Sequence, residues 1–323
     1  MIETKIKKIL PYWCLAISCI ICLFFVTSVF QNGPTSPVLA ADGLKNFDTP
    51  QVLGVSTDIR GKEVDNPVIP ALFGPVDESR ITAESYLVAD IDSGVVLMEK
   101  NGIKQESIAS LTKLLTGLLV YENLDFLSAA TISPADILNI SPSLHLQSGD
   151  SVRIEDLFNA MIIGSNNDAA VALANHVSEK AHKDFIDMMN ERAQVLGMTN
   201  SHFTNPVGLE SKNHYSTAED LLKLVRATQK LSAFTVLGRK TDYFFSSNNG
   251  KNYKTIATNK LIAKHTDLEA IKTGYTEQAG QSMITKATKA NHAVIILVLN
   301  SKDRDADTLS LEADVFAQTR WPQ

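Results

Sequence analysis

The sequence predicts an α+β fold: one antiparallel sheet built from both ends of the folded region, flanked by helices and carrying an all-helical insert. Apolar runs typical of strands occur near both ends of residues 81–323. Between them, apolar residues recur at three- and four-residue steps, as on a helix face. The 323 residues are 44% hydrophobic and 20% charged, which allows one large core, or one core with a modest second domain. We expect a cleft where the two halves meet.

Local sequence patterns predict the individual elements. Residues 86–91 and 95–98 flank the turn sequence Asp92-Ser93-Gly94 and predict a hairpin. Ser133-Pro134 indicates a helix start, and the Ser216-to-Glu219 spacing is that of a capping box. Leucines at helical spacing predict a helix after Ser107: Leu111, Leu114, Leu115, Leu118 and Leu119. Further helices are expected over residues 153–163, 169–177, 185–196 and 216–229. The later strands are expected over 243–245, 253–257, 283–287 and 293–299, before a final helix over 309–318.

Residues 1–80 predict a tether for the folded domain 81–323. Residues 1–8 carry three lysines, and residues 9–30 have no charged side chain, which suits a membrane span with the lysines on the cytoplasmic side. We expect an uncleaved single-pass anchor with the folded domain extracytoplasmic; the alternative is secretion after cleavage near residue 40. Residues 31–80 are rich in proline and glycine and predict a linker, in which the apolar residues 68–73 can dock onto the domain.

Composition excludes several classes of protein. All three cysteines lie within residues 1–30, so the folded domain has neither a disulfide framework nor a cysteine nucleophile. A net charge of −6 argues against a nucleic-acid partner. The seven histidines show no metal-ligand spacing, and no dinucleotide- or phosphate-binding glycine pattern occurs. We therefore expect no metal and no cofactor.

Three short motifs carry the chemistry: Ser110-Leu-Thr-Lys113, Ser165-Asn-Asn167 and Lys272-Thr-Gly274. Each alone is common by chance. Together they indicate a serine acyl-transfer site in which lysine, rather than histidine, activates the serine.

In the first motif, Ser110 and Lys113 lie one turn apart on one face of a helix. Lysine acts as a base only if its pKa is lowered, which burial or a nearby cation such as Lys272 achieves. A helix N-terminus at Ser110 also directs backbone N–H groups at a developing oxyanion.

The other two motifs supply polar groups around the nucleophile. Ser165 can relay a proton to a leaving amine and Asn167 can hold a substrate amide, although helix capping explains both equally well. Lys272 and Thr273 can bind a carboxylate, while Gly274 lets a substrate backbone lie close to an edge strand.

At these residues the chain resembles the D-alanyl-D-alanine carboxypeptidases of the low-molecular-mass penicillin-binding proteins. Five blocks carry the resemblance: Ala109-Ser-Leu-Thr-Lys113, Asn167-Asp-Ala-Ala170, Asn205-Pro-Val-Gly-Leu209, His214-Tyr-Ser-Thr217, and Lys272-Thr-Gly-Tyr-Thr276 with Ala279-Gly280. It implies the β-lactamase and penicillin-binding-protein fold, with an antiparallel sheet flanked by helices and an all-helical subdomain.

The resemblance also implies a mechanism. The D-Ala-D-Ala end of a peptidoglycan stem peptide would acylate Ser110, with Lys113 as base and Ser165 as proton shuttle. Substrate would contact Asn167, Lys272, Thr273, Gly274 and Tyr275, and the backbone N–H groups of Ser110 and Tyr275 would form the oxyanion hole. Water would then release the shortened peptide. β-lactam antibiotics would inhibit the enzyme.

One departure from the family leaves alternatives open. Relatives often carry an arginine in the helix after the last strand, where this chain aligns Asp307, with Arg304 nearby. This leaves room for D,D-endopeptidase action on crosslinks. A class A-like β-lactamase would need a further glutamate, for which Glu210 is a weak candidate. A non-catalytic wall-binding protein is the remaining alternative.

Overall fold

The computed structural model describes residues 69–322. The expected cytoplasmic segment 1–8, the apolar segment 9–30 and most of the linker lie outside the described residues. Between residues 69 and 322, no helix is both long and apolar enough to cross a membrane.

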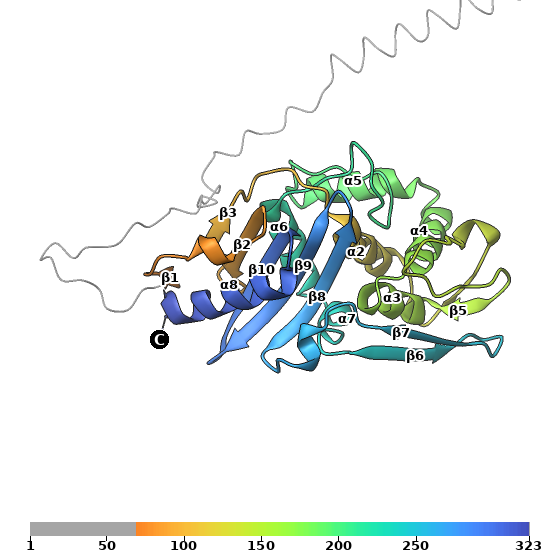
Figure 1. The fold of residues 1–323 in the computed structure, drawn as a ribbon. Coiled ribbons are helices and arrows are strands. Elements are labelled where there is room, and N and C mark those ends of the chain that lie inside the picture. The colour runs from red at the N-terminus through yellow and green to blue at the C-terminus, as the bar shows by residue number, and fades with distance from the viewer. Residues whose placement is uncertain (1–68, 323) are drawn as a thin grey trace, which may run out of the picture. The chain divides into compact units, whose positions relative to one another are not determined.

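A five-stranded antiparallel sheet organises the fold, in the order β3-β2-β10-β9-β8 (Figure 1). β10 pairs with β2 on one side and with β9 on the other, so the two ends of the domain share one sheet as expected. The strands are β2 (Ser85–Asp90), β3 (Val96–Lys100), β8 (Leu268–Thr276), β9 (Gly280–Lys289) and β10 (His292–Ser301).

Helices cover both faces of this sheet (Figure 1). Because successive side chains of a strand point to opposite faces, Leu87 joins the core shared with the helical part, whereas Val88 joins the core beneath α8. The helices are α2 (Lys113–Asn123), α3 (Ile154–Ile163), α4 (Asn167–Ala181), α5 (Phe185–Val195), α6 (Ala218–Thr228), α7 (Ser232–Thr235) and α8 (Arg304–Gln318). Single 3-10 turns are η1 (Glu78–Arg80), η2 (Ala109–Thr112), η3 (Pro134–Asp136) and η4 (Leu261–Ala263).

Several local predictions differ from the structure. The third motif lies inside β8. This strand was not predicted, because its Lys-Thr-Gly sequence lacks the apolar alternation typical of strands. β6 (Asp242–Ser246) and β7 (Asn252–Ile256) form a separate two-stranded sheet, as do β4 (Ala129–Thr131) and β5 (Ser151–Arg153), so the insert is not entirely helical. Strand composition indicates an extended backbone but not which strand it pairs with.

Helix starts show two smaller differences. α6 begins one residue later than the capping box indicates, because the Thr217 hydroxyl accepts the Asp220 N–H at 3.1 Å and is the N-cap. Ser133-Pro134 opens only the turn η3.

The end of the expected linker is folded. β1 (Ala71–Leu72) pairs with β11 (Thr319–Arg320), and Leu72 packs against the core beneath α8. Docking of this apolar stretch is therefore confirmed for its described residues. The chain enters the domain beside its last helix.

Candidate active site

The first motif lies at the junction of η2 and α2. Ser110 is in η2, and Lys113 is the first residue of α2 and fully buried. Lys113 Nζ lies 2.8 Å from Ser110 Oγ, 2.7 Å from Asn167 Oδ1 and 2.8 Å from the carbonyl oxygen of Val207. Burial lowers the pKa of Lys113 well below its ordinary value, and the charge of Lys272 lowers that pKa further.

The second motif occupies the turn between α3 and α4. Ser165 has a φ of +60°, unusual for a residue with a side chain, and is 3% exposed. Asn167 begins α4, and its Nδ2 donates to the Ile140 carbonyl at 3.0 Å while Oδ1 faces Lys113. Both polar atoms of Asn167 therefore have partners within the protein.

The third motif lies on β8, the last strand of the sheet, which has one unpaired edge. Lys272 is 2% exposed and its Nζ donates to Ser165 Oγ at 2.8 Å, although the two residues lie 107 positions apart. Burial lowers the pKa of Lys272 to about 7, and the charge of Arg304 acts in the same direction. The structure thus joins the second and third motifs directly.

Gly274 brings β8 against η2. A Cβ on Gly274 would lie 3.0 Å from the Ile108 carbonyl oxygen and 3.3 Å from the Ser110 backbone nitrogen. Both distances are tighter than most Cβ contacts, so a side chain here would push β8 and η2 apart by a few tenths of an ångström. Tyr275 follows on the same strand with 64% of its surface exposed. All eight residues expected at the site therefore lie in η2, the start of α2, the α3–α4 turn or β8.

A family model described as D-alanyl-D-alanine carboxypeptidase, Peptidase_S11, matches residues 74–303. The chain belongs to this family. Its fold is similar to that of the Streptomyces K15 DD-transpeptidase, with a TM-score of 0.67 and 26% identity, over 74% of this chain and 97% of that one. It is also similar to a Mycobacterium tuberculosis D-alanyl-D-alanine carboxypeptidase, with a TM-score of 0.68 and 27% identity, over 78% of this chain and 96% of that one.

Curated relatives give the same assignment. The chain is 29% identical to the D-alanyl-D-alanine carboxypeptidase DacF of Bacillus subtilis, over 77% of this chain and 67% of that protein. It is 31% identical to DacC of Escherichia coli, over 70% and 58%. The chain thus spans about six tenths of the length of these relatives. The family is one of serine carboxypeptidases, hydrolases of the penicillin-binding type that act on the cell wall.

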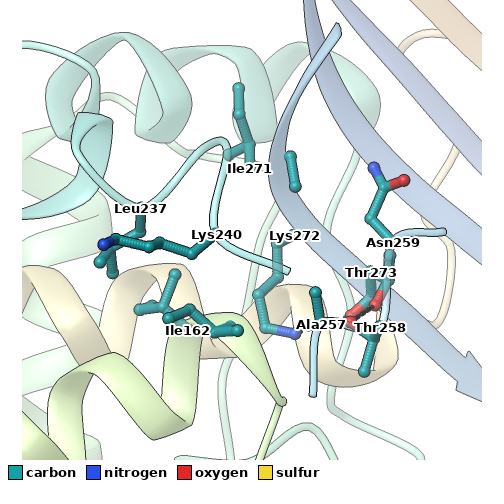
Figure 2. A pocket seen from close by; sticks show the side chains of 11 residues that line it. Ile162, Leu237, Lys240, Ala257, Thr258, Asn259, Ile271, Lys272 and Thr273 are labelled. Carbon is teal, nitrogen blue, oxygen red and sulfur yellow. Dashed lines mark hydrogen bonds between the residues drawn. The ribbon is translucent and has the colours of Figure 1, made fainter. Parts of the chain in front are cut away.

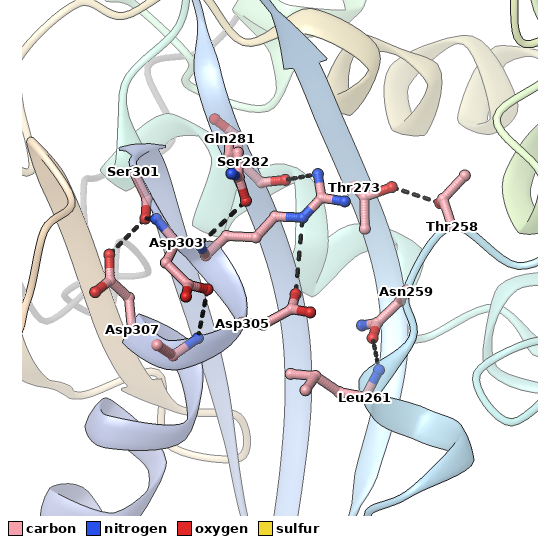
Figure 3. A network of polar contacts seen from close by, with 12 residues as sticks. Thr258, Asn259, Leu261, Thr273, Gln281, Ser282, Ser301, Asp303, Asp305 and Asp307 are labelled. Atoms are coloured by element: carbon pink, nitrogen blue, oxygen red, sulfur yellow. Dashed lines mark hydrogen bonds and ion pairs between the residues drawn. The ribbon is translucent and has the colours of Figure 1, made fainter.

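Within this carboxypeptidase fold, Arg304 and Asp307 have different surroundings. Asp307 is fully buried and accepts a hydrogen bond from Ser301, which Figure 3 shows. It also accepts one from the backbone N–H of Thr82, so it supports the start of α8. Arg304, the first residue of α8, donates from Nη1 to the Gly274 carbonyl oxygen at 3.0 Å. Of these two residues of α8, Arg304 at the helix start contacts β8, and Asp307 does not.

Two further contacts were not expected from the sequence. Thr258, which follows β7, hydrogen-bonds the Thr273 hydroxyl, and Figure 3 shows the two side chains facing each other. The Val207 carbonyl contacts Lys113, and the block Asn205–Leu209 was the only sequence signal for it. Both contacts join segments distant in sequence.

A small cavity of about 10 Å³ lies along β8, lined by Lys272, Thr258 and Ile162 among others (Figure 2). Its volume is about that of one water-sized sphere, so it is no substrate pocket. Glu210, the candidate for a β-lactamase glutamate, accepts the N–H of Gln278 at 2.8 Å, in the turn between β8 and β9. Among residues 69–322, no group of three or more acidic, cysteine or histidine side chains could hold a metal ion.

Proposed function

We propose that this chain is a serine-type D-Ala-D-Ala carboxypeptidase that acts on peptidoglycan stem peptides through an acyl-enzyme on Ser110. The observation that carries the proposal is the position of Lys113, whose Nζ lies 2.8 Å from Ser110 Oγ while two acceptors hold it from other sides.

The contacts of Lys113 orient it as a base. A neutral amine has two N–H groups and one lone pair. The amide oxygen of Asn167, whose Nδ2 is committed to Ile140, and the carbonyl of Val207 can only accept, so they take the two N–H groups. The lone pair is left for the Ser110 hydroxyl. The lowered pKa of Lys113 supplies the neutral amine that this arrangement needs.

In the proposed reaction, Lys113 takes the Ser110 proton as Oγ attacks the carbonyl carbon of the penultimate D-alanine. The oxyanion forms beside the backbone N–H groups of Ser110 and Tyr275. Ser165 gives its hydroxyl proton to the leaving nitrogen of the terminal D-alanine and takes one from the Lys272 ammonium that donates to it. Lys113 is then protonated and Lys272 neutral at the acyl-enzyme. Asn167 contacts the substrate amide through the second N–H of Nδ2, because the first donates to Ile140. Water then hydrolyses the ester, passing its proton through Ser165 to Lys272 while Lys113 returns a proton to Ser110 Oγ.

The cations around β8 favour a substrate with a free carboxylate. Lys272, the Thr273 hydroxyl and the Arg304 guanidinium lie on or against one strand, and a carboxylate is the anion that such donors bind well. A peptide crosslink whose acceptor residue carries no carboxylate beside the cleaved amide would leave these donors without an anion to bind. We therefore favour carboxypeptidase activity over D,D-endopeptidase activity. A β-lactam carries a carboxylate beside its reactive carbonyl and would acylate Ser110 in the same way.

The proposed substrate and the N-terminal sequence support a proposal for the location of the chain. Peptidoglycan lies outside the cytoplasm, and residues 9–30 have the length and polarity of a single span behind a lysine-bearing segment. We propose a single-pass membrane protein with its catalytic domain on the extracytoplasmic side, the alternative being secretion after cleavage. Western blotting of membrane and medium fractions distinguishes the two.

Intact-mass spectrometry of the full-length chain with benzylpenicillin tests the activity. We expect a mass increase equal to one penicillin that persists for minutes to hours and is absent in Ser110→Ala. A rapid return to the free mass with consumption of the drug would instead indicate a β-lactamase. A chain that forms no adduct and releases no D-alanine from a stem pentapeptide would be a binding protein, and the proposal would be wrong.

A further inference from the structure

The residue before the nucleophile has an unfavourable backbone conformation. Ala109 has a φ of +45°, in the left-handed region, where a Cβ lies too close to the following carbonyl oxygen. Ala109 is 3% exposed and lies directly before Ser110, so the strain is at the peptide unit whose N–H is proposed to face the oxyanion. Surrounding contacts must hold this peptide in place.

A buried chain of hydrogen bonds ends on this peptide. The Thr112 hydroxyl donates to the Ala109 carbonyl at 2.8 Å, and the same hydroxyl oxygen lies 2.7 Å from His214 Nε2. The Thr204 backbone N–H donates to His214 Nδ1 at 3.1 Å. Thr112 is fully buried and His214 is 3% exposed.

The directions along the chain are fixed from both ends. Because Thr204 donates to Nδ1, the proton of a neutral His214 lies on Nε2. Because the Thr112 hydroxyl uses its proton on Ala109, it must accept from Nε2. Burial, with His202 nearby, lowers the pKa of His214 to about 4, so the imidazole is neutral at pH 7. Both ring nitrogens have partners, which leaves none to take a proton from water or substrate.

Two glycines pack against opposite ends of the same peptide unit. A Cβ on Gly208 would lie 1.8 Å from the Ala109 carbonyl oxygen, whereas one on Gly274 would lie 3.3 Å from the Ser110 nitrogen. In a trans peptide, C=O and N–H point in opposite directions. Holding the carbonyl on the Gly208 side therefore directs the N–H of Ser110 toward β8.

We propose that Thr112 and His214 are positioning residues that hold the Ala109 carbonyl and so direct the Ser110 N–H into the oxyanion hole. The inference rests on the proposed acyl-enzyme at Ser110 and gives the His214-Tyr-Ser-Thr217 block a role in that step. His214 acts through Thr112 and Ala109 and does not touch substrate.

The test compares Thr112→Val with Thr112→Ser in the full-length chain. Valine has the shape of threonine but no hydroxyl, whereas serine keeps it. Two quantities are measured with benzylpenicillin: the acylation rate constant, separated from initial binding, and the infrared stretching frequency of the ester carbonyl in the acyl-enzyme. The second reports how strongly the oxyanion hole hydrogen-bonds that carbonyl, which a merely structural role of Thr112 would not change.

For Thr112→Val we expect acylation to slow about 10- to 100-fold. This is no more than the slowing caused by removing an oxyanion-hole donor altogether, because the Ser110 N–H is misdirected but still present. Initial binding should be unchanged and the carbonyl band should move to higher frequency, whereas Thr112→Ser should match the unsubstituted chain. Acylation at the normal rate, or slowing without a band shift, would overturn the inference.

If Thr112→Val does not fold, His214→Leu and His214→Gln replace it. Glutamine keeps an N–H donor toward Thr112 and should leave the carbonyl band at its normal frequency, whereas leucine should move the band to higher frequency. Identical frequencies in the two variants would overturn the inference. An unsubstituted chain that forms no adduct would contradict the proposed function itself.

Discussion

Asn167 holds the amine of Lys113, with 2.7 Å between Oδ1 and Nζ, although the two residues lie 54 positions apart. The lysine of the first motif is thus held by the last residue of the second. Lys272 of the third motif in turn holds Ser165. The three motifs form one hydrogen-bonded unit, and a change in any of them is expected to alter the chemistry of the others.

Lys113→Met should slow acylation of Ser110 by penicillin about 10²- to 10⁴-fold, the usual contribution of a positioned base. Methionine fills a similar volume but cannot take the serine proton. Stopped-flow or quenched-flow labelling measures the rate, with the exposed Lys230→Met as control. Normal acylation by Lys113→Met would place the base elsewhere.

Lys272→Met should move the acidic limb of the acylation pH profile to higher pH. The charge of Lys272 lowers the pKa of Lys113, so its removal favours protonated Lys113 and raises that pKa. More alkaline conditions are then needed for the neutral amine. The second-order rate constant of acylation by penicillin, measured against pH, reports the position of this limb. Lys240→Met is the matched control, because Lys240 lines the same small cavity as Lys272. An unmoved or acid-shifted limb would contradict electrostatic coupling of the two lysines.

Gly208→Ala should destabilise the fold and slow acylation more than Gly250→Ala does. Both glycines have positive φ, +87° and +84°, so both substitutions strain the backbone. Only at Gly208 does the new Cβ meet the Ala109 carbonyl oxygen, because no atom lies within 4 Å at Gly250. The collision should cost about 1–3 kcal/mol beyond the strain. Denaturant unfolding of the two variants measures it, and equal losses would show that φ alone matters.

Arg304→Gln should lower kcat/KM about 10- to 100-fold for peptides ending in free D-alanine, as expected for loss of a charged hydrogen bond. A peptide ending in D-alanine amide should lose little, because it presents no carboxylate. Arg304→Lys keeps the charge and should retain part of the activity. Equal losses on both peptides would remove Arg304 from carboxylate recognition and reopen the endopeptidase alternative.

His214 should make the fold sensitive to acid. Its pKa is lowered to about 4 from an ordinary 6.5, so its contribution to stability is complete above about pH 6.5 and is lost as pH falls toward 4, where the unfolded chain binds the proton more readily. A pKa shift of this size corresponds to about 3 kcal/mol in the free energy of unfolding. Denaturant unfolding at pH 7 and pH 4 should therefore show a smaller loss for His214→Gln than for the unsubstituted chain. Equal losses would mean that His214 is not the group that titrates.

Local chemistry made part of this structure predictable. The spacing of Ser110 and Lys113 places them one turn apart in any helical conformation, and the hairpin around Asp92–Gly94 needs only neighbouring residues. The pairing of β8 and the capping of α6 by Thr217 were not predicted, because a Lys-Thr-Gly strand lacks apolar alternation and two adjacent hydroxyl residues cap equally well.

By itself, the sequence determined which side chains meet within a helical turn, that strands at both ends of the domain enclose helices, and which family the motifs indicate. Only the tertiary structure decided that Val207 and Asn167 orient Lys113, that Lys272 reaches Ser165, and that Arg304 rather than Asp307 faces β8. Each of these contacts joins segments far apart in the chain. Their geometry, and the burial that lowers the lysine pKa values, arise only when the sheet and the helical part pack together, because desolvation depends on every neighbouring element at once.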